Sequence, residues 1–560
     1  MDSRPARAAF LEQLVAEGVP YMFGNPGTVE QGFLDELRHF PAIEYVLTLQ
    51  ESVAVGMADG HARATRRPAV VQLHSGVGLG NGIGMLYQAK RGHAPLVVVA
   101  GEAGLRYEAM EAQMAADLVA MAEPVTKWAT RVVDPDSTLR VLRRAFKVAG
   151  TPPYGPVLVV LPADVMDRPT SEEAVPVTYP DTASAPDAGS LERAAELLAD
   201  ARRPIVIAGD GIHFAGAQAE LGRLAEVWGA EVWGADWAEA NLSDRHPAYA
   251  GQLGHMFGES SRRITEAADA VLLCGTYALP EVFPALYGVF GAGVPVVHID
   301  LDTDAIAKNF PVDLGLVADP KRSLALLADA IEARMSRAER TAAADRLRRG
   351  AAERAEARTA AARTARERAA AQELPHIAFA EELAAQLPDD VVLFDESLTA
   401  SPDLFGPLPA AEPGRWHQTR GGSLGVGIPG ALGAQLARPD STVVGFTGDG
   451  GSLYTFQALW TAARYDIGAK LVVCNNSGYK LLELNIGQYW GEQGIAAHEY
   501  PEIFDLSRPA VDFVALSRSL GVPALRVEKP GQVRAAVAEA LAHRGPFLID
   551  LVTERRGRGR

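Results

Sequence analysis

The sequence contains almost no cysteine: its 560 residues include two, Cys274 and Cys474, each at the end of a short apolar run. Two isolated thiols provide neither a disulfide framework nor a zinc site, so we expect both to be buried and reduced. The N-terminal residues also lack the hydrophobic core of a signal peptide, and no apolar run reaches the roughly 20 residues that a membrane-spanning helix needs. These absences predict a cytoplasmic protein.

Positive charge is scarce as well. The chain has 53 Lys and Arg residues against 70 Asp and Glu residues, which gives a formal net charge of -17. Because nucleic acids and anionic membranes attract proteins through an excess of Lys and Arg, neither is an expected partner. The remaining composition, 48% hydrophobic and 22% charged, is that of a globular chain long enough for about three domains.

Short apolar runs alternate with helical patterns in three segments of the chain. We expect strands at residues 21–23, 43–49, 69–73, 96–99 and 157–161, then at 205–208, 271–273 and 296–299, and finally at 391–394, 443–446, 471–474 and 547–551. This alternation predicts the α/β class, with three doubly wound and mainly parallel sheets.

The domain boundaries follow from composition. We place the three domains at residues 1–175, 191–330 and 373–560. A Pro-, Ser- and Ala-rich stretch at 169–190 is typical of a linker. An Ala-, Arg- and Glu-rich stretch at 331–372 predicts a connector, either a solvated helix or a mobile segment.

One strand–helix–strand unit of the third segment carries polar groups where its strands end. The run 441–447 (STVVGFT) is broken by Gly448-Asp449-Gly450-Gly451, and Asn475-Asn476 follow the next apolar run. The carboxyl ends of parallel strands form the rim where α/β sheets bind ligands, so Asp449 and the Asn pair should converge there. Carboxylate and amide oxygens suit Mg²⁺, which proteins bind with few groups of their own plus substrate phosphates. The unit predicts a metal holding a diphosphate, with a tight turn as the simpler alternative.

A second GDG sequence serves as an internal control. Gly209-Asp210-Gly211 also follows a strand-like run, residues 204–208 (PIVIA). No Asn pair lies one strand–helix–strand unit downstream of it. We therefore interpret this copy as a turn only.

With the Asn pair, the stretch 448–479 resembles the signature of thiamine diphosphate (ThDP) enzymes, GDG followed by NN after a helix and a strand. The order of the three segments is similar to that of the ThDP decarboxylase and acetohydroxyacid synthase superfamily over nearly the whole chain. The resemblance implies ThDP and Mg²⁺ as cofactors. It implies a metal site made by Asp449, the Asn476 side chain and the Gly478 carbonyl. It also implies a diphosphate site made by Gly450, Gly451 and Ser452, with Gly448 and Tyr479 as further cofactor-binding residues.

Three other segments fit the rest of such a cofactor site. Glu51 begins the helical pattern SVAVGMADGHAR; alone it would be interpreted as complementing a helix dipole, but the resemblance implies that it binds N1′ of the aminopyrimidine. In the segment 420–429 (RGGSLGVGIP), the resemblance implies that the Gly422 carbonyl accepts from the 4′-amino group and that Leu424 lies beneath the thiazolium. Glu396, Ser397 and Thr399 follow another strand-like run and are candidates for the same rim.

Within the superfamily, two stretches resemble benzoylformate decarboxylase and its relatives. Residues 23–28 (FGNPGT) resemble the loop in which Thr28 would contact the substrate carboxylate, and residues 72–75 (QLHS) resemble the segment in which His74 would transfer protons. A histidine suits that role because its ordinary pKa lies near neutral pH. Leu481 and Asn485, in a helix expected after the Asn pair, would line the substrate pocket by position.

The glycines of residues 76–84 never meet the G-x-G-x-x-G spacing of a dinucleotide site, so we interpret the stretch as a loop close to the cofactor. Residues 277–284 (YALPEVFP) lack the second active-site histidine of the benzoylformate decarboxylase branch, and Asn485 is polar where enzymes for aromatic acids carry Phe. His93 is expected to be structural, and no motif argues for FAD in the middle domain.

The resemblance implies ThDP- and Mg²⁺-dependent decarboxylation of a 2-oxo acid, with some carboligation of the resulting aldehyde. A transferase of the acetohydroxyacid synthase type and a ThDP-binding protein without turnover are the alternatives. The superfamily places its cofactor between the N-terminal domain of one subunit and the C-terminal domain of another. A homodimer or homotetramer with shared active sites is therefore implied.

Overall fold

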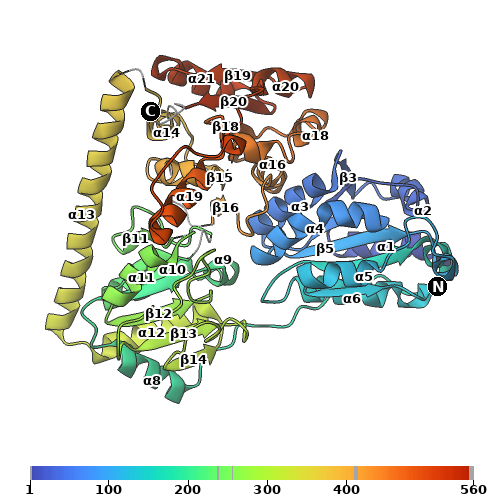
Figure 1. Ribbon diagram of the computed structural model, residues 1–560. Helices are drawn as coiled ribbons and strands as arrows, with labels where there is room; N and C mark the ends of the chain where they lie inside the picture. Colours follow the sequence, from blue (N-terminus) through green and yellow to red (C-terminus); the bar gives the residue numbers. More distant parts are fainter. Residues whose placement is uncertain (1–2, 236–238, 255, 372, 409–413, 554–560) are drawn as a thin grey trace.

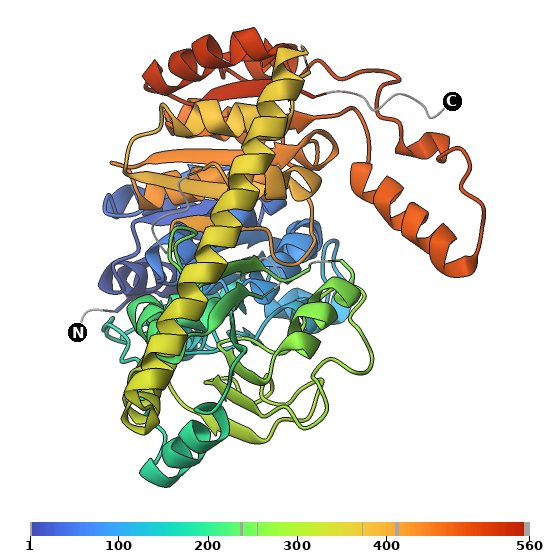
Figure 2. The ribbon, with the colours of Figure 1, turned by 90° about the vertical axis from the view of Figure 1, so that its left-hand side faces the viewer.

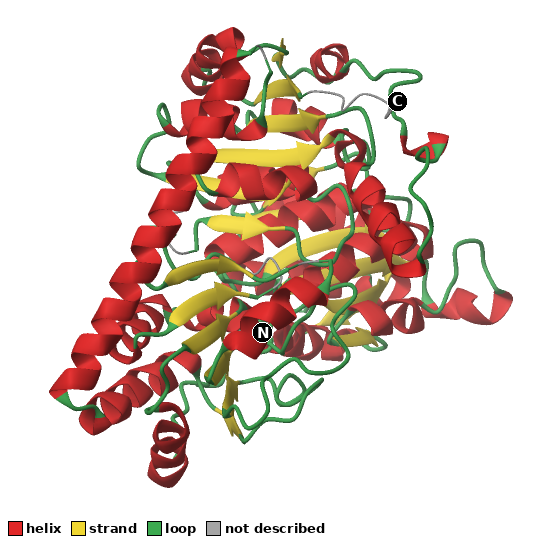
Figure 3. Cartoon of the chain, turned by 60° about the vertical axis from the view of Figure 1, so that its left-hand side comes forward, coloured by secondary structure: helices red, strands yellow, loops and turns green. Residues whose placement is uncertain are grey.

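The computed structural model describes residues 3–235, 239–254, 256–371, 373–408 and 414–553, which form three α/β domains (Figure 1). Each domain has one six-stranded sheet in which every neighbouring pair of strands is parallel. Helices lie on both faces of the sheets (Figure 3). The predicted architecture of three doubly wound domains is confirmed.

The N-terminal sheet has the strand order β3-β2-β4-β5-β7-β6. Its strands are β2 (Tyr21–Gly24), β3 (Glu44–Leu47), β4 (Ala69–His74), β5 (Leu96–Glu102), β6 (Trp128–Arg131) and β7 (Val157–Pro162). Its helices are α1 (Ala6–Ala16), α2 (Gln31–Glu36), α3 (Glu51–Thr65), α4 (Ser75–Arg91), α5 (Leu118–Ala122), α6 (Thr138–Ala149) and α7 (Ala163–Met166). A short antiparallel pair joins β1 (Arg4–Pro5) to β8 (Pro169–Thr170).

The middle sheet has the order β11-β10-β9-β12-β13-β14. Its strands are β9 (Pro204–Ala208), β10 (Glu231–Gly234), β11 (Tyr249–Gln252), β12 (Ala270–Cys274), β13 (Val296–Asp300) and β14 (Leu314–Val317). Its helices are α8 (Ala188–Leu198), α9 (Asp210–Ala215), α10 (Gln218–Trp228), α11 (Gly258–Ala267) and α12 (Pro320–Arg334). The predicted connector is a helix of 34 residues, α13 (Arg337–Ala370), which runs along one side of the molecule from the middle to the C-terminal domain (Figure 2).

The C-terminal sheet has the order β16-β15-β17-β18-β20-β19. Its strands are β15 (Val391–Glu396), β16 (Trp416–Gln418), β17 (Thr442–Gly448), β18 (Lys470–Asn475), β19 (Ala524–Val527) and β20 (Phe547–Val552). Its helices are α14 (His376–Ala384), α15 (Ser401–Phe405), α16 (Gly427–Ala437), α17 (Asp449–Ser452), α18 (Ala458–Arg464), α19 (Lys480–Gln493), α20 (Phe513–Ser519) and α21 (Pro530–Ala542).

In each sheet, one strand has later strands of the chain on both of its sides, and this makes a switch point. β2 lies between β3 and β4, β9 between β10 and β12, and β15 between β16 and β17. Ligands of open α/β sheets bind in the crevice outside the carboxyl ends of the strands at such a switch point. The three crevices are bordered by the residues after β2 and His74, by the second GDG sequence, and by Glu396 with Asp449.

The structure corrects three details of the sequence interpretation. Six strands of the large sheets are not predicted, and five of them, β6, β11, β14, β16 and β19, lie at sheet edges. The Gly-rich stretch 76–84 is not a loop but part of α4, because Gly78 and Gly82 pack against Glu51 and Leu73, where a larger side chain would crowd them. The segment after Asp449 forms two short helices, α17 and α18, instead of one.

The N- and C-terminal domains meet where α3 crosses α16. Glycines at the crossing allow the backbones to touch: a Cβ on Gly60 would overlap the Gly430 carbonyl, and one on Gly433 would overlap the Met57 carbonyl. Gly56 packs against the ring of Pro429 in the same contact. Among the described residues, no helix is long and apolar enough to cross a membrane.

Candidate active site

Glu51 is the first residue of α3, beyond the carboxyl end of β3. The residue is buried, with 6% of its surface exposed. The Asn25 side-chain amide donates to Oε1 at 3.3 Å, and the Asn81 amide donates to Oε2 at 3.1 Å. Both donors are neutral amides, so neither forms an ion pair with Glu51.

His74 ends β4 and lies against a carboxylate that the sequence did not reveal. Nδ1 of His74 is 3.0 and 3.2 Å from the two carboxylate oxygens of Glu30, whose side chain is fully buried. The Gly27 N–H also donates to Oε2 of Glu30 at 2.9 Å. Burial raises the pKa of Glu30, and the neighbouring His74 opposes that rise. A carboxylate on Nδ1 fixes the ring orientation and leaves Nε2 for proton exchange.

The loop after β2 brings these side chains together. A Cβ on Gly27 would overlap the His74 ring, so the loop lies directly on the imidazole. A Cβ on Gly78 in α4 would lie 3.1 Å from Oε1 of Glu51 and 3.3 Å from Cβ of His74. Thr28 is exposed at the tip of the same loop. The predicted residues Glu51, His74 and Thr28 therefore form one cluster, the N-terminal half-site.

Asp449 and the Asn pair converge at the rim of the C-terminal sheet. The Gly478 N–H lies 3.1 Å from Oδ2 of Asp449 and 3.0 Å from Oδ1 of Asn476, so both oxygens face the same backbone turn. Burial raises the pKa of Asp449 to about 6. A bound cation would reverse that shift, because opposite charge favours the ionised carboxylate.

This oxygen set fits a hard cation. Among the described residues there is no cluster of three His, Cys, Asp or Glu side chains that could hold a metal. A site made of one carboxylate, one amide oxygen and one backbone carbonyl would leave positions for phosphate oxygens and water, as Mg²⁺ prefers. The residues present therefore fit the predicted group.

The surface beside Asp449 fits a diphosphate. Gly448 has open space around its Cα, and a Cβ on Gly450 would strike the ring of Tyr479. The Ser452 hydroxyl donates to the Asp449 carbonyl at 2.9 Å and so links the last residue of the short helix α17 to its first. The Gly450 N–H donates to Oδ1 of Asp449 at 2.8 Å, whereas the Gly451 N–H has no helical acceptor and can bind an anion.

Glu396 supports the loop between β16 and α16. Its buried carboxylate accepts from the Gly427 N–H at 2.6 Å and also from the Gly425 N–H. Burial raises the pKa of Glu396 to about 7. Ser397 binds Asp395 through both its N–H and its hydroxyl, at 2.8 and 2.6 Å, and Thr399 is half-buried. These contacts fix the residues at the carboxyl end of β15 and the loop before α16.

The loop itself leaves space above it. Gly422 adopts a φ of +72°, and a Cβ there would meet nothing within 4 Å. Leu424 is half-buried two residues later. The segment 419–424, here called the cofactor loop, therefore presents a free backbone and one apolar side chain at the position predicted for the aminopyrimidine and thiazolium.

Helix α19 follows the loop that carries Asn476 and Gly478, and it projects away from the body of the chain (Figure 2). Leu481 and Asn485 lie in its first two turns, and Oδ1 of Asn485 is a buried oxygen without a hydrogen-bond partner. One residue of the 14-residue helix, Trp490, is fully buried. The projecting helix thus lacks a covering surface within this chain.

The second cluster, made of Asp449, Asn476 and Gly478, is here called the C-terminal half-site. No hydrogen bond or ion pair among the described residues links Glu51, His74 or Thr28 to the group of Asp449, Asn476 and Gly478. The predicted role of each of these residues stays a prediction, but their grouping into two clusters is a property of the fold.

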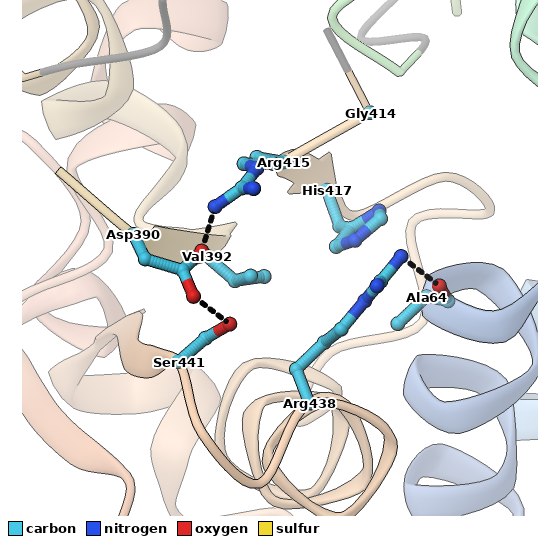
Figure 4. A pocket seen from close by; sticks show the side chains of 8 residues that line it. All are labelled: Ala64, Asp390, Val392, Gly414, Arg415, His417, Arg438 and Ser441. Atoms are coloured by element: carbon cyan, nitrogen blue, oxygen red, sulfur yellow. Dashed lines mark hydrogen bonds and ion pairs between the residues drawn. The ribbon is translucent and has the colours of Figure 1, made fainter. Parts of the chain in front are cut away.

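Two small cavities lie elsewhere. One of about 80 Å³ lies at the amino end of the C-terminal sheet, where Asp390 pairs with Arg415 and binds Ser441, and Arg438 donates to the Ala64 carbonyl (Figure 4). That edge is opposite the rim of Asp449. A second cavity of about 130 Å³ lies behind Glu30, between α2 and β7. Neither is the candidate active site.

Three doubly wound domains, with a buried acid on the first rim and an oxygen-ligand cluster beside an anion-binding turn on the third, define a ThDP-dependent enzyme. The chain belongs to the thiamine pyrophosphate enzyme family, named after the same cofactor. Its N-terminal TPP binding domain matches residues 5–121, its central domain residues 191–327 and its C-terminal TPP binding domain residues 404–551.

Individual relatives match nearly the whole chain. Benzoylformate decarboxylase of Pseudomonas aeruginosa is 30% identical over 98% of this chain and 99% of its own. Acetolactate synthase isozyme 3 large subunit of Escherichia coli is 27% identical over 95% and 91%. The solved ThDP-dependent 4-hydroxybenzoylformate decarboxylase of Rhodococcus jostii superposes with a TM-score of 0.83 at 25% identity, covering 98% of this chain and 99% of that one.

Proposed function

We propose that this enzyme decarboxylates a small 2-oxo acid with ThDP and Mg²⁺, and that it ligates some of the resulting aldehyde to a second carbonyl compound. The observation that carries the proposal is the His74–Glu30 pair beside Glu51. Decarboxylation needs a group that gives and takes protons at the substrate, and a histidine oriented by a buried carboxylate suits that role. The full-length likeness to benzoylformate decarboxylase supports it.

The bound cofactor supplies a nucleophilic carbon and the electron sink for loss of CO₂. Glu51 holds a proton against the aminopyrimidine N1′. Asp449, Asn476 and the Gly478 carbonyl hold Mg²⁺, and the turn 448–452 with Tyr479 receives the diphosphate. Gly422 and Leu424 position the two rings.

The substrate would lie between the half-sites. Thr28 donates to its carboxylate from the tip of the loop, and His74 exchanges a proton with its carbonyl oxygen. Leu481 and Asn485 line the far side of the pocket. The polar Asn485 side chain, with its unsatisfied buried oxygen, favours an acid that offers a hydrogen-bond donor there.

We also propose that the active unit is a homodimer, alone or within a homotetramer. No hydrogen bond or ion pair among the described residues joins the half-sites. The segments that carry them also expose apolar side chains, namely Leu49, Val77, Tyr87, Leu482, Leu484 and Tyr489. Apolar groups gathered at incomplete sites indicate a surface that another copy covers. The partner's projecting α19 would then enclose the N-terminal half-site.

A screen of 2-oxo acids for CO₂ release, with ThDP and Mg²⁺ supplied, tests the activity. For at least one acid, CO₂ release with free aldehyde is expected, and any shortfall of aldehyde against CO₂ should appear as the ligated product. Acetolactate formed from pyruvate without free aldehyde would instead favour the transferase, which the 27% identity to acetolactate synthase supports. Binding of ThDP without turnover of any acid would favour a cofactor-binding protein.

A further inference from the structure

The second GDG sequence is more than the turn that the sequence analysis assigned to it. It occupies the switch point of the middle sheet, where β9 ends and α9 begins. A Cβ on Gly209 would overlap Thr276, and one on Gly211 would press on the Gly275 backbone. The two glycines therefore close the crevice against β12 and leave the Asp210 side chain directed elsewhere.

Asp210 reaches out of its own domain. Its Oδ2 lies 3.0 Å from Nη2 of Arg420 in the C-terminal domain and 3.4 Å from Nδ1 of His93 in the N-terminal domain. The Glu239 N–H donates to Oδ1 at 3.1 Å. Burial raises the pKa of Asp210, but Arg420 and His93 outweigh that effect and hold the pKa below its ordinary value. The carboxylate is therefore charged and touches all three domains.

Arg420 belongs to the cofactor loop, which is held at its first three residues and at Gln418, the residue before it. The Gln418 carbonyl accepts from Nη2 of Arg63 at 2.8 Å, and the Thr419 N–H donates to the Asp395 carbonyl at 2.9 Å. Arg420 pairs with Asp210, and the Gly421 N–H donates to the side chain of Gln88. The next residue, Gly422, is the first with open space above it.

The ion pair between Arg420 and Asp210 is buried, so separating its two members is unfavourable. The Arg420 and Asp210 side chains are 9% and 2% exposed, so neither can replace its partner readily with water. Removing one member of a buried pair leaves an uncompensated charge, which is strongly unfavourable. Loop conformations that draw Arg420 away from Asp210 are disfavoured for the same reason.

We propose that Asp210 is a positioning residue for the cofactor: through Arg420, the middle domain holds residues 421–424 in the conformation that receives the aminopyrimidine. This inference rests on the proposed cofactor site. The inference assigns a function to the middle domain. The crevice at the switch point of that domain is closed where Gly209 and Gly211 pack against the residues after β12. The alternative is an ion pair that merely joins domains.

The test is Asp210→Asn in the full-length protein, with ThDP titrated calorimetrically in excess Mg²⁺. The variant keeps the shape but loses the charge, so the Kd for ThDP should rise about tenfold while kcat at saturating ThDP changes little. The matched control is Asp319→Asn. Asp319 is a buried aspartate of the same domain that caps α12 by accepting from the Arg322 N–H at 2.9 Å, far from the loop in sequence. It should lower the melting temperature without changing the Kd.

Arg420→Lys provides a second measurement if the first variant folds poorly. Lysine keeps the charge but loses the planar fork, so an intermediate Kd is expected. An unchanged Kd in folded Asp210→Asn or in Arg420→Lys would overturn the inference, as would a fall in kcat alone. A wild-type protein that gives no heat with ThDP would instead overturn the proposed function, so the two failures are distinguishable.

Discussion

Replacing Glu30 with Gln should separate proton transfer from cofactor binding. Glu30 accepts on one oxygen from the Gly27 N–H at 2.9 Å and lies 3.0 Å from Nδ1 of His74. Both contacts are to Oε2, and Oε1 lies 3.2 Å from Nδ1. Glutamine has the same shape but a single acceptor oxygen and no charge, so if that oxygen keeps the two contacts, its NH₂ group replaces Oε1 beside Nδ1. The charge-assisted contact with the imidazole is then lost, and the ring turns or moves its proton to the other nitrogen.

The magnitude follows from the lost contact. A hydrogen bond to a charged group contributes about 1.5–3 kcal/mol, and about 1.4 kcal/mol corresponds to a factor of ten in rate. We therefore expect kcat/KM for the accepted 2-oxo acid to fall about 10- to 100-fold. The Kd for ThDP should stay unchanged, because no hydrogen bond or ion pair among the described residues joins Glu30 to Glu51 or to Asp449.

Two assays on the same preparation decide the matter: CO₂ release as a function of substrate, and calorimetric titration with ThDP. Glu36→Gln is the control, because Glu36 lies in the neighbouring helix α2 and pairs with Arg7 at 3.3 Å, away from His74. The reasoning is refuted if Glu30→Gln keeps its kcat/KM, or if it loses ThDP binding in the same proportion.

Three further outcomes are expected. Glu51→Gln should lower kcat by at least about 100-fold while the Kd for ThDP changes little, as measured by CO₂ release and calorimetry. Gly60→Ala places a methyl group on a backbone carbonyl and should cost about 1–3 kcal/mol in chemical denaturation, whereas Gly531→Ala, with nothing within 4 Å, should not destabilise. Burial raises the pKa of Glu396 to about 7, so its neutral form is favoured on folding and its contribution to stability is full below pH 4.5 and lost as the pH rises through 7. From pH 5 to pH 8 the unfolding free energy of the wild type should therefore fall about 2–3 kcal/mol more than that of Glu396→Gln; equal slopes would contradict this.

The sequence predicts the interior of each sheet better than its edges. Strands such as β18, with six consecutive buried residues, have the continuous apolar runs that a parallel sheet requires. The edge strand β6 (WATR) is half-buried throughout, and β19 (ALRV) carries an exposed arginine, so neither has that pattern. Edge strands are defined by the neighbour they pair with, and that information is not local.

In the candidate site, too, residues within one local unit are predicted, whereas partners far apart in the sequence are not. The spacing from Asp449 to Asn476 lies within one strand–helix–strand unit, and the structure brings both to one turn. The partnership of Glu30 with His74 spans 44 residues, and no local signal distinguishes Glu30 from an ordinary carboxylate at a helix start. The helix α4 is missed for a related reason: its glycines lower helix propensity, and only packing against Glu51 and Leu73 compensates.

The proposed homodimer makes a final prediction possible. No hydrogen bond or ion pair among the described residues joins Glu51 to Asp449 within one chain. The proposal therefore places Glu51 from one chain beside Asp449 from the other. Glu51→Gln and Asp449→Asn should each be inactive alone.

Mixing the two inactive variants under conditions that exchange subunits should then restore activity, because each mixed dimer has one site that contains both wild-type residues. Random pairing gives half mixed dimers with one good site in two, so about a quarter of the wild-type rate is expected. Size-exclusion chromatography with light scattering verifies that dimers have re-formed. If each chain contained a whole site, every site in the mixture would carry one substitution, and the rate would stay at the level of the separate variants.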